Sequence, residues 1–454
     1  MARLFASQKG VKSTIITTSL TSTLISKSLE ETKSPNLSIN VLTINFHFAE
    51  FGLPQDNKNT DIARIMNTPP SLFKATMKLQ EPLEKLLHEE KPQCLIADML
   101  FPWATDSAAK FSIPRLVFHG CGFFPLCAST CVKLYQPYKN VTSDSEAFVI
   151  PNLPGDIKMR RRELIELNMI EDEEKTFTRW LKESRESEVR SYGIVFNSFY
   201  EMEQIYADHY REVFGRRAWH IGPVSLCNSR INNEDKTHRG KEASIGDEHE
   251  CMNWLGSKKP NSVVYICFGS MASFSHTQLT EIAMGLEASN QQFIWVVRKE
   301  RKDEEDNNEN WVSEGFEKRI EGKGLIIRGW APQVLILDHE AVGGFVTHCG
   351  WNSVLESVSC GVPMVTWPLF AEQFYNEKLV TDVLKIGVPI GVKSEGDVRR
   401  DAIENAVIRI MMGEEGEELR NKAKMLAQKA KEAVEVGGSS YMDLNSLIHE
   451  LQSS

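Results

Sequence analysis

The sequence lacks the features that mark several large classes of protein. Its nine cysteines include no CxxC pair and no paired metal-ligand spacing, so a disulfide framework and a zinc cluster are disfavoured, and reduced, mostly buried thiols are expected. No segment approaches the ~20 apolar residues needed to span a bilayer, and the N-terminus has no basic region followed by an apolar core. We therefore expect a cytoplasmic protein without a membrane span or a bound metal.

A surplus of positive charge is also missing. Lys and Arg number 52 against 62 Asp and Glu, giving a formal net charge of −10, which disfavours a nucleic-acid backbone or an anionic lipid surface as the main partner. The 454 residues are 41% hydrophobic and 25% charged, an ordinary globular composition in a chain too long for a single hydrophobic core. We expect two domains in a monomeric protein.

Short β-branched runs alternate with helical stretches along most of the chain, which predicts an α/β protein with parallel sheets covered by helices. These runs cover residues 13–18, 94–97, 115–119, 193–197, 262–268, 293–297, 324–327 and 344–347. A polar stretch at 228–250 has almost no apolar residue and is predicted to link a first domain, 1–227, to a second, 251–454. No GxGxxG turn follows the first strand, which disfavours an oxidoreductase or epimerase on a dinucleotide fold.

The segment from Trp330 to Gln373 carries the chemical signal of the second domain. Its centre, GGFVTHCGWNS, is a strand that turns through Gly350 into a helix near Asn352. A parallel strand that turns through glycine into a helix leaves backbone N–H groups and the positive end of the helix dipole at the carboxyl edge of the sheet. We expect an anion site there, which a diphosphate would fit.

Side chains next to this turn suit a nucleotide. His348 ends the strand, and Asn352 and Ser353 can cap the helix or donate to phosphate oxygens. Glu356 lies one turn further along, where its carboxylate could accept two hydrogen bonds from a ribose diol. Each feature alone is more often a part of the fold than of a ligand site, so the prediction depends on their order and spacing together.

The two ends of the segment add groups for a base and a sugar. Trp330, followed by Ala331 at a strand exit, offers a flat face for stacking a base, and Gln333 could read the edge of that base. Glu372 and Gln373 supply acceptors and donors suited to sugar hydroxyls.

On these residues the sequence resembles the plant secondary-product glycosyltransferases, which move a sugar from a UDP-sugar to small lipophilic acceptors. The 44-residue segment matches the signature of that family from its first Trp to its last Gln. The resemblance continues through CLIADMLFPWATDSAAKFSIPRLVFHG, YGIVFNSFYEME, RRAWHIGPVSLC and SVVYICFGSMASF. It looks closest to the branch that glucosylates hydroxycoumarins, flavonoids and related phenols. It implies a GT-B fold, with two Rossmann-like domains facing across a cleft and a last helix that packs back on the first domain.

The resemblance also implies a role for each matching residue of the donor site. Trp330, supported by Ala331, would stack on uracil beside Gln333, and Glu356 would bind the ribose. The residues implied to surround the diphosphate are Ser270, His348, Gly350, Asn352 and Ser353. The residues implied to position the sugar are Trp351, Glu372 and Gln373. A final Gln goes with glucose in this family, so UDP-glucose is the expected co-substrate, with no cofactor.

For the first domain, the resemblance implies a histidine base after the first strand, oriented by an aspartate, and inversion at the anomeric carbon. Asp98, at the end of the run CLIAD, matches the aspartate. The histidine has no match, because the opening MARLFASQKGVKSTIITT looks like the first helix and second strand of the family. We therefore expect a first domain that lacks its first strand and is weakened, beside an intact donor domain. Loss of a general base costs about 10²–10⁴ in rate, so acidic acceptors would suffer least.

The remaining expectations concern the acceptor. His119 is predicted to line its pocket together with Phe123 and Phe124. The function implied is inverting transfer of glucose from UDP-glucose to a hydroxyl of a phenolic acceptor, giving a β-O-glucoside. The alternative is a truncated transferase that still binds the UDP-sugar but turns over poorly.

Overall fold

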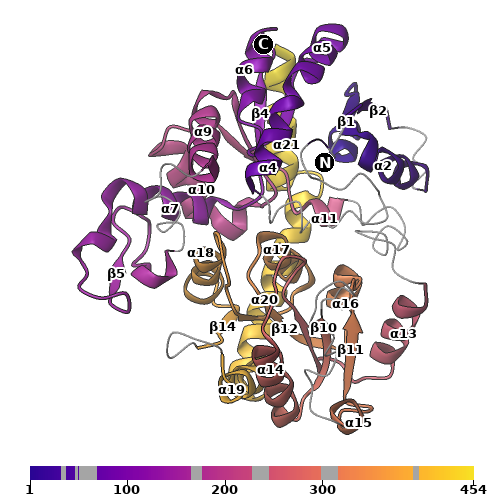
Figure 1. Ribbon diagram of the computed structural model, residues 1–454, viewed down its shortest axis with the longest axis vertical. Coiled ribbons are helices and arrows are strands. Elements are labelled where there is room, and N and C mark those ends of the chain that lie inside the picture. The colour runs from indigo at the N-terminus through magenta and orange to yellow at the C-terminus, as the bar shows by residue number, and fades with distance from the viewer. Residues whose placement is uncertain are drawn as a thin grey trace. The chain divides into compact units, whose positions relative to one another are not determined.

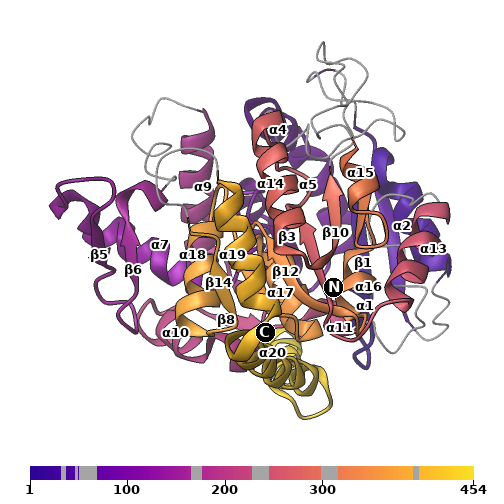
Figure 2. The same ribbon diagram turned by 90° about the horizontal axis from the view of Figure 1, so that it is seen from below.

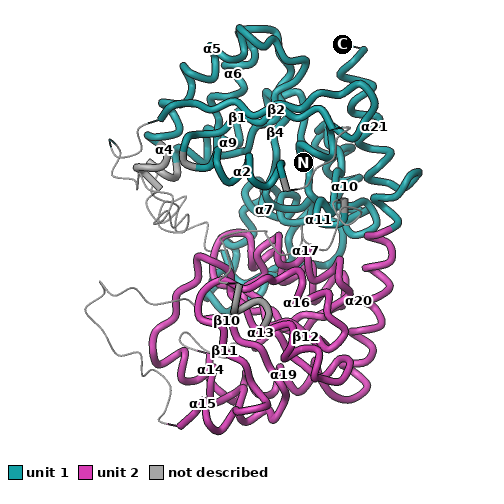
Figure 3. Tube along the Cα trace, turned by 90° about the vertical axis from the view of Figure 1, so that its right-hand side faces the viewer, with its two compact units in different colours: residues 1–231, 432–454 teal, residues 232–431 magenta. Residues whose placement is uncertain are grey.

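The structure is a computed structural model of the chain and describes residues 1–31, 37–46, 50, 69–164, 176–227, 245–297, 315–391 and 398–453. The chain divides into two compact units (Figure 3). Unit 1 comprises Met1–Ile231 and Glu432–Ser454, and unit 2 comprises Asn232–Lys431. Residues 228–244 of the predicted linker lie outside the described residues, and helix α13 (Ile245–Gly256) begins before the linker's predicted end at residue 250.

Unit 2 is built on one parallel sheet of six strands in the order β11-β10-β9-β12-β13-β14. The strands are β9 (Val263–Cys267), β10 (Gln292–Val297), β11 (Gly324–Arg328), β12 (Val342–Thr347), β13 (Met364–Thr366) and β14 (Gly387–Pro389). The chain runs outward from β9 to β11 and then returns to β12 on the other side of β9. In such doubly wound sheets, ligands bind outside the carboxyl ends of the strands at the point where the order reverses. The fold therefore predicts a ligand-binding site at the carboxyl ends of β9 and β12.

Helices cover the sheet of unit 2. Besides α13 they are α14 (His276–Ser289), α15 (Phe316–Arg319), α16 (Gln333–Asp338), α17 (Trp351–Cys360), α18 (Gln373–Lys378), α19 (Arg400–Met411) and α20 (Gly413–Val434), whose last turn belongs to unit 1. Helices α14 and α19 lie side by side (Figure 1, Figure 2). Gly285 permits this approach, since a β-carbon there would lie 2.8 Å from the Arg400 carbonyl oxygen and 2.8 Å from the Ile403 β-carbon.

Unit 1 contains a parallel sheet of four strands in the order β3-β4-β7-β8, a separate parallel pair β1-β2 and an antiparallel pair β5-β6. The strands are β1 (Ser13–Thr18), β2 (Ile39–Ile44), β3 (Leu95–Asp98), β4 (Arg115–His119), β5 (Ala147–Val149), β6 (Lys158–Arg160), β7 (Gly193–Phe196) and β8 (Ala218–His220). All the β-branched runs singled out in the sequence form strands, and β2, β5, β6, β8, β13 and β14 are strands that the sequence analysis missed.

The helices of unit 1 include the C-terminal one, which packs against the four-stranded sheet. They are α1 (Ala2–Ala6), α2 (Ser19–Glu31), α4 (Pro69–Lys78), α5 (Gln80–Glu90), α6 (Trp103–Ala109), α7 (Phe123–Tyr135), α9 (Thr176–Arg190), α10 (Tyr200–Glu212), α11 (Val224–Cys227) and α21 (Ser439–Ser453). Leu444 and Leu447 of α21 share one buried cluster with Leu116, Val195 and Trp219 of the four-stranded sheet. The C-terminal helix is thus part of the core of unit 1. Within the described ranges, no helix is both long and apolar enough to cross a bilayer.

Candidate functional site

The turn between β12 and α17 exposes the start of that helix. Gly350 is the N-cap residue, and no side chain makes a capping hydrogen bond there, so the predicted capping by Asn352 or Ser353 does not occur in this structure. Cys349 adopts a left-handed conformation with φ +62°, and its carbonyl oxygen accepts a hydrogen bond from the Asn376 amide at 2.9 Å. The fixed turn leaves the first N–H groups of α17 available to an anion.

His348 fills the space between two glycines at the point where the strand order reverses. A β-carbon at Gly269, which follows β9, would lie 2.8 Å from His348 Cε1, and one at Gly350 would lie 2.5 Å from its Nε2. Burial lowers the pKa of His348 to about 4, so the ring is neutral near pH 7. Its buried Nδ1 has no hydrogen-bond partner in the described part of the chain. Such an atom costs about 1–3 kcal/mol, which a bound ligand could recover.

Gln333, Ser353 and Glu356 come together from two helices. The Gln333 amide nitrogen, at the start of α16, lies 2.8 Å from Glu356 Oε2 and 3.2 Å from Ser353 Oγ, both on α17. The side chain predicted to read a base is thus the one that orients the predicted ribose carboxylate. Trp330 precedes this group and is half-buried, while Ala331 is buried. Three of the predicted donor residues, Gln333, Ser353 and Glu356, are therefore in direct contact on unit 2.

The predicted sugar-binding residues differ in accessibility. The Gln373 amide oxygen accepts hydrogen bonds from the backbone N–H groups of Leu369 and Phe370 at 2.9 and 3.0 Å. The turn therefore fixes the orientation of this side chain and leaves its NH₂ group as the donor. Glu372, at the N-cap of α18, is half-buried, but Trp351 is buried in the core. Of the remaining predicted donor residues, Ser270 and Asn352 are exposed.

In unit 1, Asp98 ends β3 at the carboxyl edge of the four-stranded sheet. Its Oδ1 accepts the backbone N–H of Leu100 at 2.9 Å, and burial raises the pKa of its carboxyl group although this bond and the charges of His119 and Arg115 oppose the rise. The Asp98 carbonyl oxygen accepts a hydrogen bond from the buried guanidinium of Arg115 at 2.9 Å. Arg115 also donates to Thr105 at 2.6 Å and Ser187 at 2.8 Å. The sequence analysis missed Arg115, whose only local signal is a charge at the start of an apolar strand.

His119 lies at the end of the neighbouring strand, β4, and the residue is 5% exposed. Its Nε2 is 3.4 Å from Glu188 on α9, a residue that no sequence motif singled out. Phe123 and Phe124 are fully buried and pack against Phe196 and Tyr206. Phe123 thus packs on the ends of β7 and β8, and Phe124 packs on α10. Direct contact of either ring with an acceptor would require the start of α7 to move.

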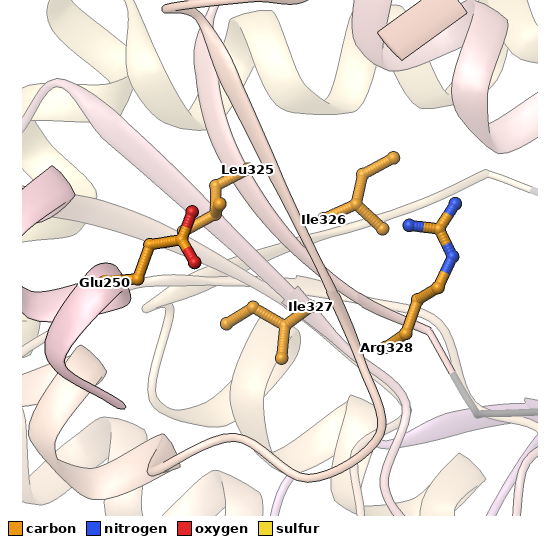
Figure 4. Close-up of a pocket in the computed structure, with 5 residues that line it drawn as sticks. All are labelled: Glu250, Leu325, Ile326, Ile327 and Arg328. Carbon is orange, nitrogen blue, oxygen red and sulfur yellow. The ribbon is translucent and has the colours of Figure 1, made fainter. Parts of the chain in front are cut away.

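A shallow pocket on unit 2 lies away from these residues. It has a volume of about 230 Å³ and is lined by Glu250 of α13 and by Leu325, Ile326, Ile327 and Arg328 of the edge strand β11 (Figure 4). It contains none of the predicted site residues. Across the residues that the structure describes, no group of three or more His, Cys, Asp or Glu side chains is arranged to hold a metal ion.

Comparison with known proteins finds a matching family model and relatives that are similar over nearly the whole chain. Residues 233–448 match the family model described as UDP-glucoronosyl and UDP-glucosyl transferase. The chain is 55% identical to the UDP-glucose flavonoid 3-O-glucosyltransferase 7 of Fragaria ananassa, covering 99% of this chain and 92% of that protein. It is also 55% identical to the scopoletin glucosyltransferase of Nicotiana tabacum, covering 99% of this chain and 94% of the relative.

A solved structure matches the whole fold. The crystal structure of Glycyrrhiza uralensis UGT73P12, complexed with glycyrrhetinic acid 3-O-monoglucuronide, superposes with a TM-score of 0.90 at 40% identity, covering 100% of this chain and 92% of that one. Together with the parallel sheets of both units, this match confirms the prediction of two Rossmann-like α/β domains.

Proposed function

The chain belongs to the plant UDP-glycosyltransferase family, and on that basis we propose that it transfers glucose from UDP-glucose to a hydroxyl group of a small phenolic acceptor. The names of its relatives in Fragaria ananassa and Nicotiana tabacum support a flavonoid or a coumarin as the acceptor class. The acceptor oxygen attacks the anomeric carbon as the bond to UDP breaks, so the product is a β-O-glucoside.

One observation carries the donor assignment: a neutral His348 with an unpartnered buried nitrogen lies beside the uncapped start of α17, where the strand order reverses. A diphosphate at this point would accept hydrogen bonds from the imidazole and from the first N–H groups of α17, assisted by Ser270, Asn352 and Ser353. These contacts strengthen as negative charge develops on the departing UDP, which favours bond breaking.

The nucleoside and sugar are assigned to the flanking residues. Trp330 would stack on uracil, and Glu356, oriented by Gln333 at 2.8 Å, would accept hydrogen bonds from the ribose hydroxyls. The NH₂ group of Gln373 and the carboxylate of Glu372 would bind glucose hydroxyls. Because both amide-oxygen contacts of Gln373 are made within its own turn, we expect this side chain to discriminate between sugars by donation rather than acceptance.

In unit 1 we propose that Asp98 belongs to the catalytic apparatus and that His119 contributes to the acceptor pocket. The raised pKa of Asp98 and its position at the carboxyl edge of the sheet support a role in handling the acceptor proton. We also propose a monomer that works in the cytoplasm without a metal ion, for which unchanged turnover in a chelator is the simplest check.

Release of UDP from UDP-glucose, measured against scopoletin, a flavonol and a non-phenolic alcohol, tests the reaction. Calorimetry with UDP tests the donor site separately. Glu356→Gln should weaken UDP binding, whereas Asp98→Asn should lower turnover and leave UDP affinity unchanged. Failure of the folded chain to bind UDP would remove the donor assignment. Binding of UDP-glucose without turnover of any acceptor would favour a sugar-nucleotide-binding protein over an enzyme.

A further inference from the structure

A thiol, an imidazole and a carboxylate form a buried cluster at the carboxyl end of β4. Cys121 Sγ lies 3.2 Å from His119 Nδ1, and His119 Nε2 lies 3.4 Å from Glu188 Oε2. The hydroxyl of Tyr210 donates to the other oxygen of Glu188 at 3.1 Å. Because Glu188 accepts the proton on Nε2, the facing nitrogen Nδ1 is left to accept the proton of the thiol. The two ring nitrogens thus have opposite partners, as in enzymes that activate a cysteine with a histidine.

A carboxylate charge lies beside the imidazole of His119. Burial would raise the pKa of Glu188, but hydrogen bonds from His119 and Tyr210 and the charges of His119 and Arg216 hold it below its usual value. Glu188 therefore stays ionised next to the ring nitrogen Nε2. The charged and titratable groups that interact with His119 or Glu188 include Asp98, Arg115, Tyr210 and Arg216, and Glu203 accepts the backbone N–H of Phe124 on the helix that follows Cys121.

Access to the thiol is available through the turn that carries it. Cys121 is 6% exposed, and the preceding Gly120 is exposed, with open space beside its α-carbon: a β-carbon there would meet no atom within 4 Å. Two other cysteines on α7 differ. Cys127 and Cys131 are 0% and 1% exposed, and burial raises the pKa of both thiols. Cys121 thus differs from Cys127 and Cys131, because it has both the His119 imidazole beside its thiol and open space beside the preceding Gly120.

We propose that Cys121 is an activated thiol that forms covalent adducts with soft electrophiles, α,β-unsaturated carbonyl compounds in particular. His119 Nδ1 takes the thiol proton, and the sulfur electron pair forms an S–C bond at the β-carbon. The double-bond electrons move to the carbonyl oxygen, and the resulting enolate recovers the proton from His119. The addition therefore needs no further reactant and releases nothing. It would place a modification beside the proposed acceptor pocket, although the reactivity itself does not depend on the proposed function.

Alkylation of the full folded chain with N-ethylmaleimide or iodoacetamide tests the proposal. The tryptic peptide from Leu116 to Lys133 contains Cys121, Cys127 and Cys131, so fragment-ion mass spectrometry must locate the label. An ordinary thiol of pKa ~8.5 should react about 80-fold faster at pH 8 than at pH 6, whereas a histidine-paired thiol of pKa ~6.5 should react only about 4-fold faster. We expect the small ratio at Cys121.

The variants separate activation from mere exposure. His119→Asn should raise the ratio of the Cys121 labelling rates at pH 8 and pH 6 to the large value of an ordinary thiol. Glu188→Gln should raise this ratio partly, and Cys127→Ser should leave the labelling of Cys121 unchanged. The partly exposed Cys360 serves as the ordinary reference thiol in the same sample. The proposal is overturned if Cys121 stays unlabelled while Cys360 reacts. It is also overturned if Cys121 of the unmodified chain shows the large ratio of labelling rates expected for an ordinary thiol. If His119→Asn fails to fold, as judged by thermal unfolding, the ratios in the unmodified chain and in Glu188→Gln decide it.

Discussion

Replacement of Gly269 by alanine tests whether the position of His348 controls nucleotide binding. Gly269 has φ +74°, and a β-carbon there would lie 2.8 Å from Cε1 and 2.9 Å from Nε2 of His348. Contacts this short force the imidazole to move. Alanine in the left-handed region adds a backbone cost of about 1–2 kcal/mol. We therefore expect Gly269→Ala both to destabilise unit 2 and to displace the proposed phosphate ligand.

The two effects separate with a matched control. Gly322, also in unit 2, has φ +76°, and a β-carbon added there would meet no atom within 4 Å, so Gly322→Ala carries the backbone cost without the collision. Loss of one hydrogen bond to a charged phosphate costs about 1.5–3 kcal/mol, or about 10- to 150-fold in affinity. Calorimetric titration with UDP should show this loss in Gly269→Ala and unchanged affinity in Gly322→Ala.

Thermal unfolding of both variants must accompany the titrations. Similar falls in stability would establish that the backbone costs match, and any difference in UDP affinity then comes from His348. If Gly269→Ala binds UDP as tightly as the unmodified chain, or if Gly322→Ala loses affinity equally, the proposed role of His348 is wrong.

Three further predictions concern unit 1. Asp443 Oδ2 accepts hydrogen bonds from Arg211 Nη2 at 2.8 Å and from the backbone N–H of His220 at 2.9 Å. Asp443→Asn removes this carboxylate and should lower the free energy of unfolding by about 2–4 kcal/mol. An unchanged midpoint of thermal unfolding would contradict this. Burial raises the pKa of Glu203 to about 7. Between about pH 4.5 and 7 the folded state therefore holds a proton that the unfolded state has lost, and the free energy of unfolding falls as pH rises. Glu203→Gln should reduce this fall, and an equal dependence of the unfolding free energy on pH in both proteins, measured by denaturant titration, would refute it. Strands β1 and β2 pair only with each other among the described strands, so their amides should exchange faster than those of β4 and β7 in hydrogen-exchange mass spectrometry.

The sequence by itself determined the class of fold and singled out the residues of the proposed donor site. Short β-branched runs predicted these strands because strands that are buried on both faces of a parallel sheet are apolar along most of their length. The resemblance singled out the residues from Trp330 to Gln373, and the contacts of Gln333 with Ser353 and Glu356 join consecutive elements of this segment. The Gln333 and Glu356 contact, for example, joins residues only 23 apart in the chain.

Only the tertiary structure decided which distant residues support these sites. The sequence carried no sign that Gly269 borders His348, since their contact depends on β9 and β12 being neighbours in the sheet. The pairing of His119 with Glu188 depends on how α9 packs on the end of β4. Hydrophobic periodicity reports that a face is buried but not which element covers it. For the same reason, a hydrogen bond between His220 and Asp443, 223 residues apart, could be found only from the folded chain.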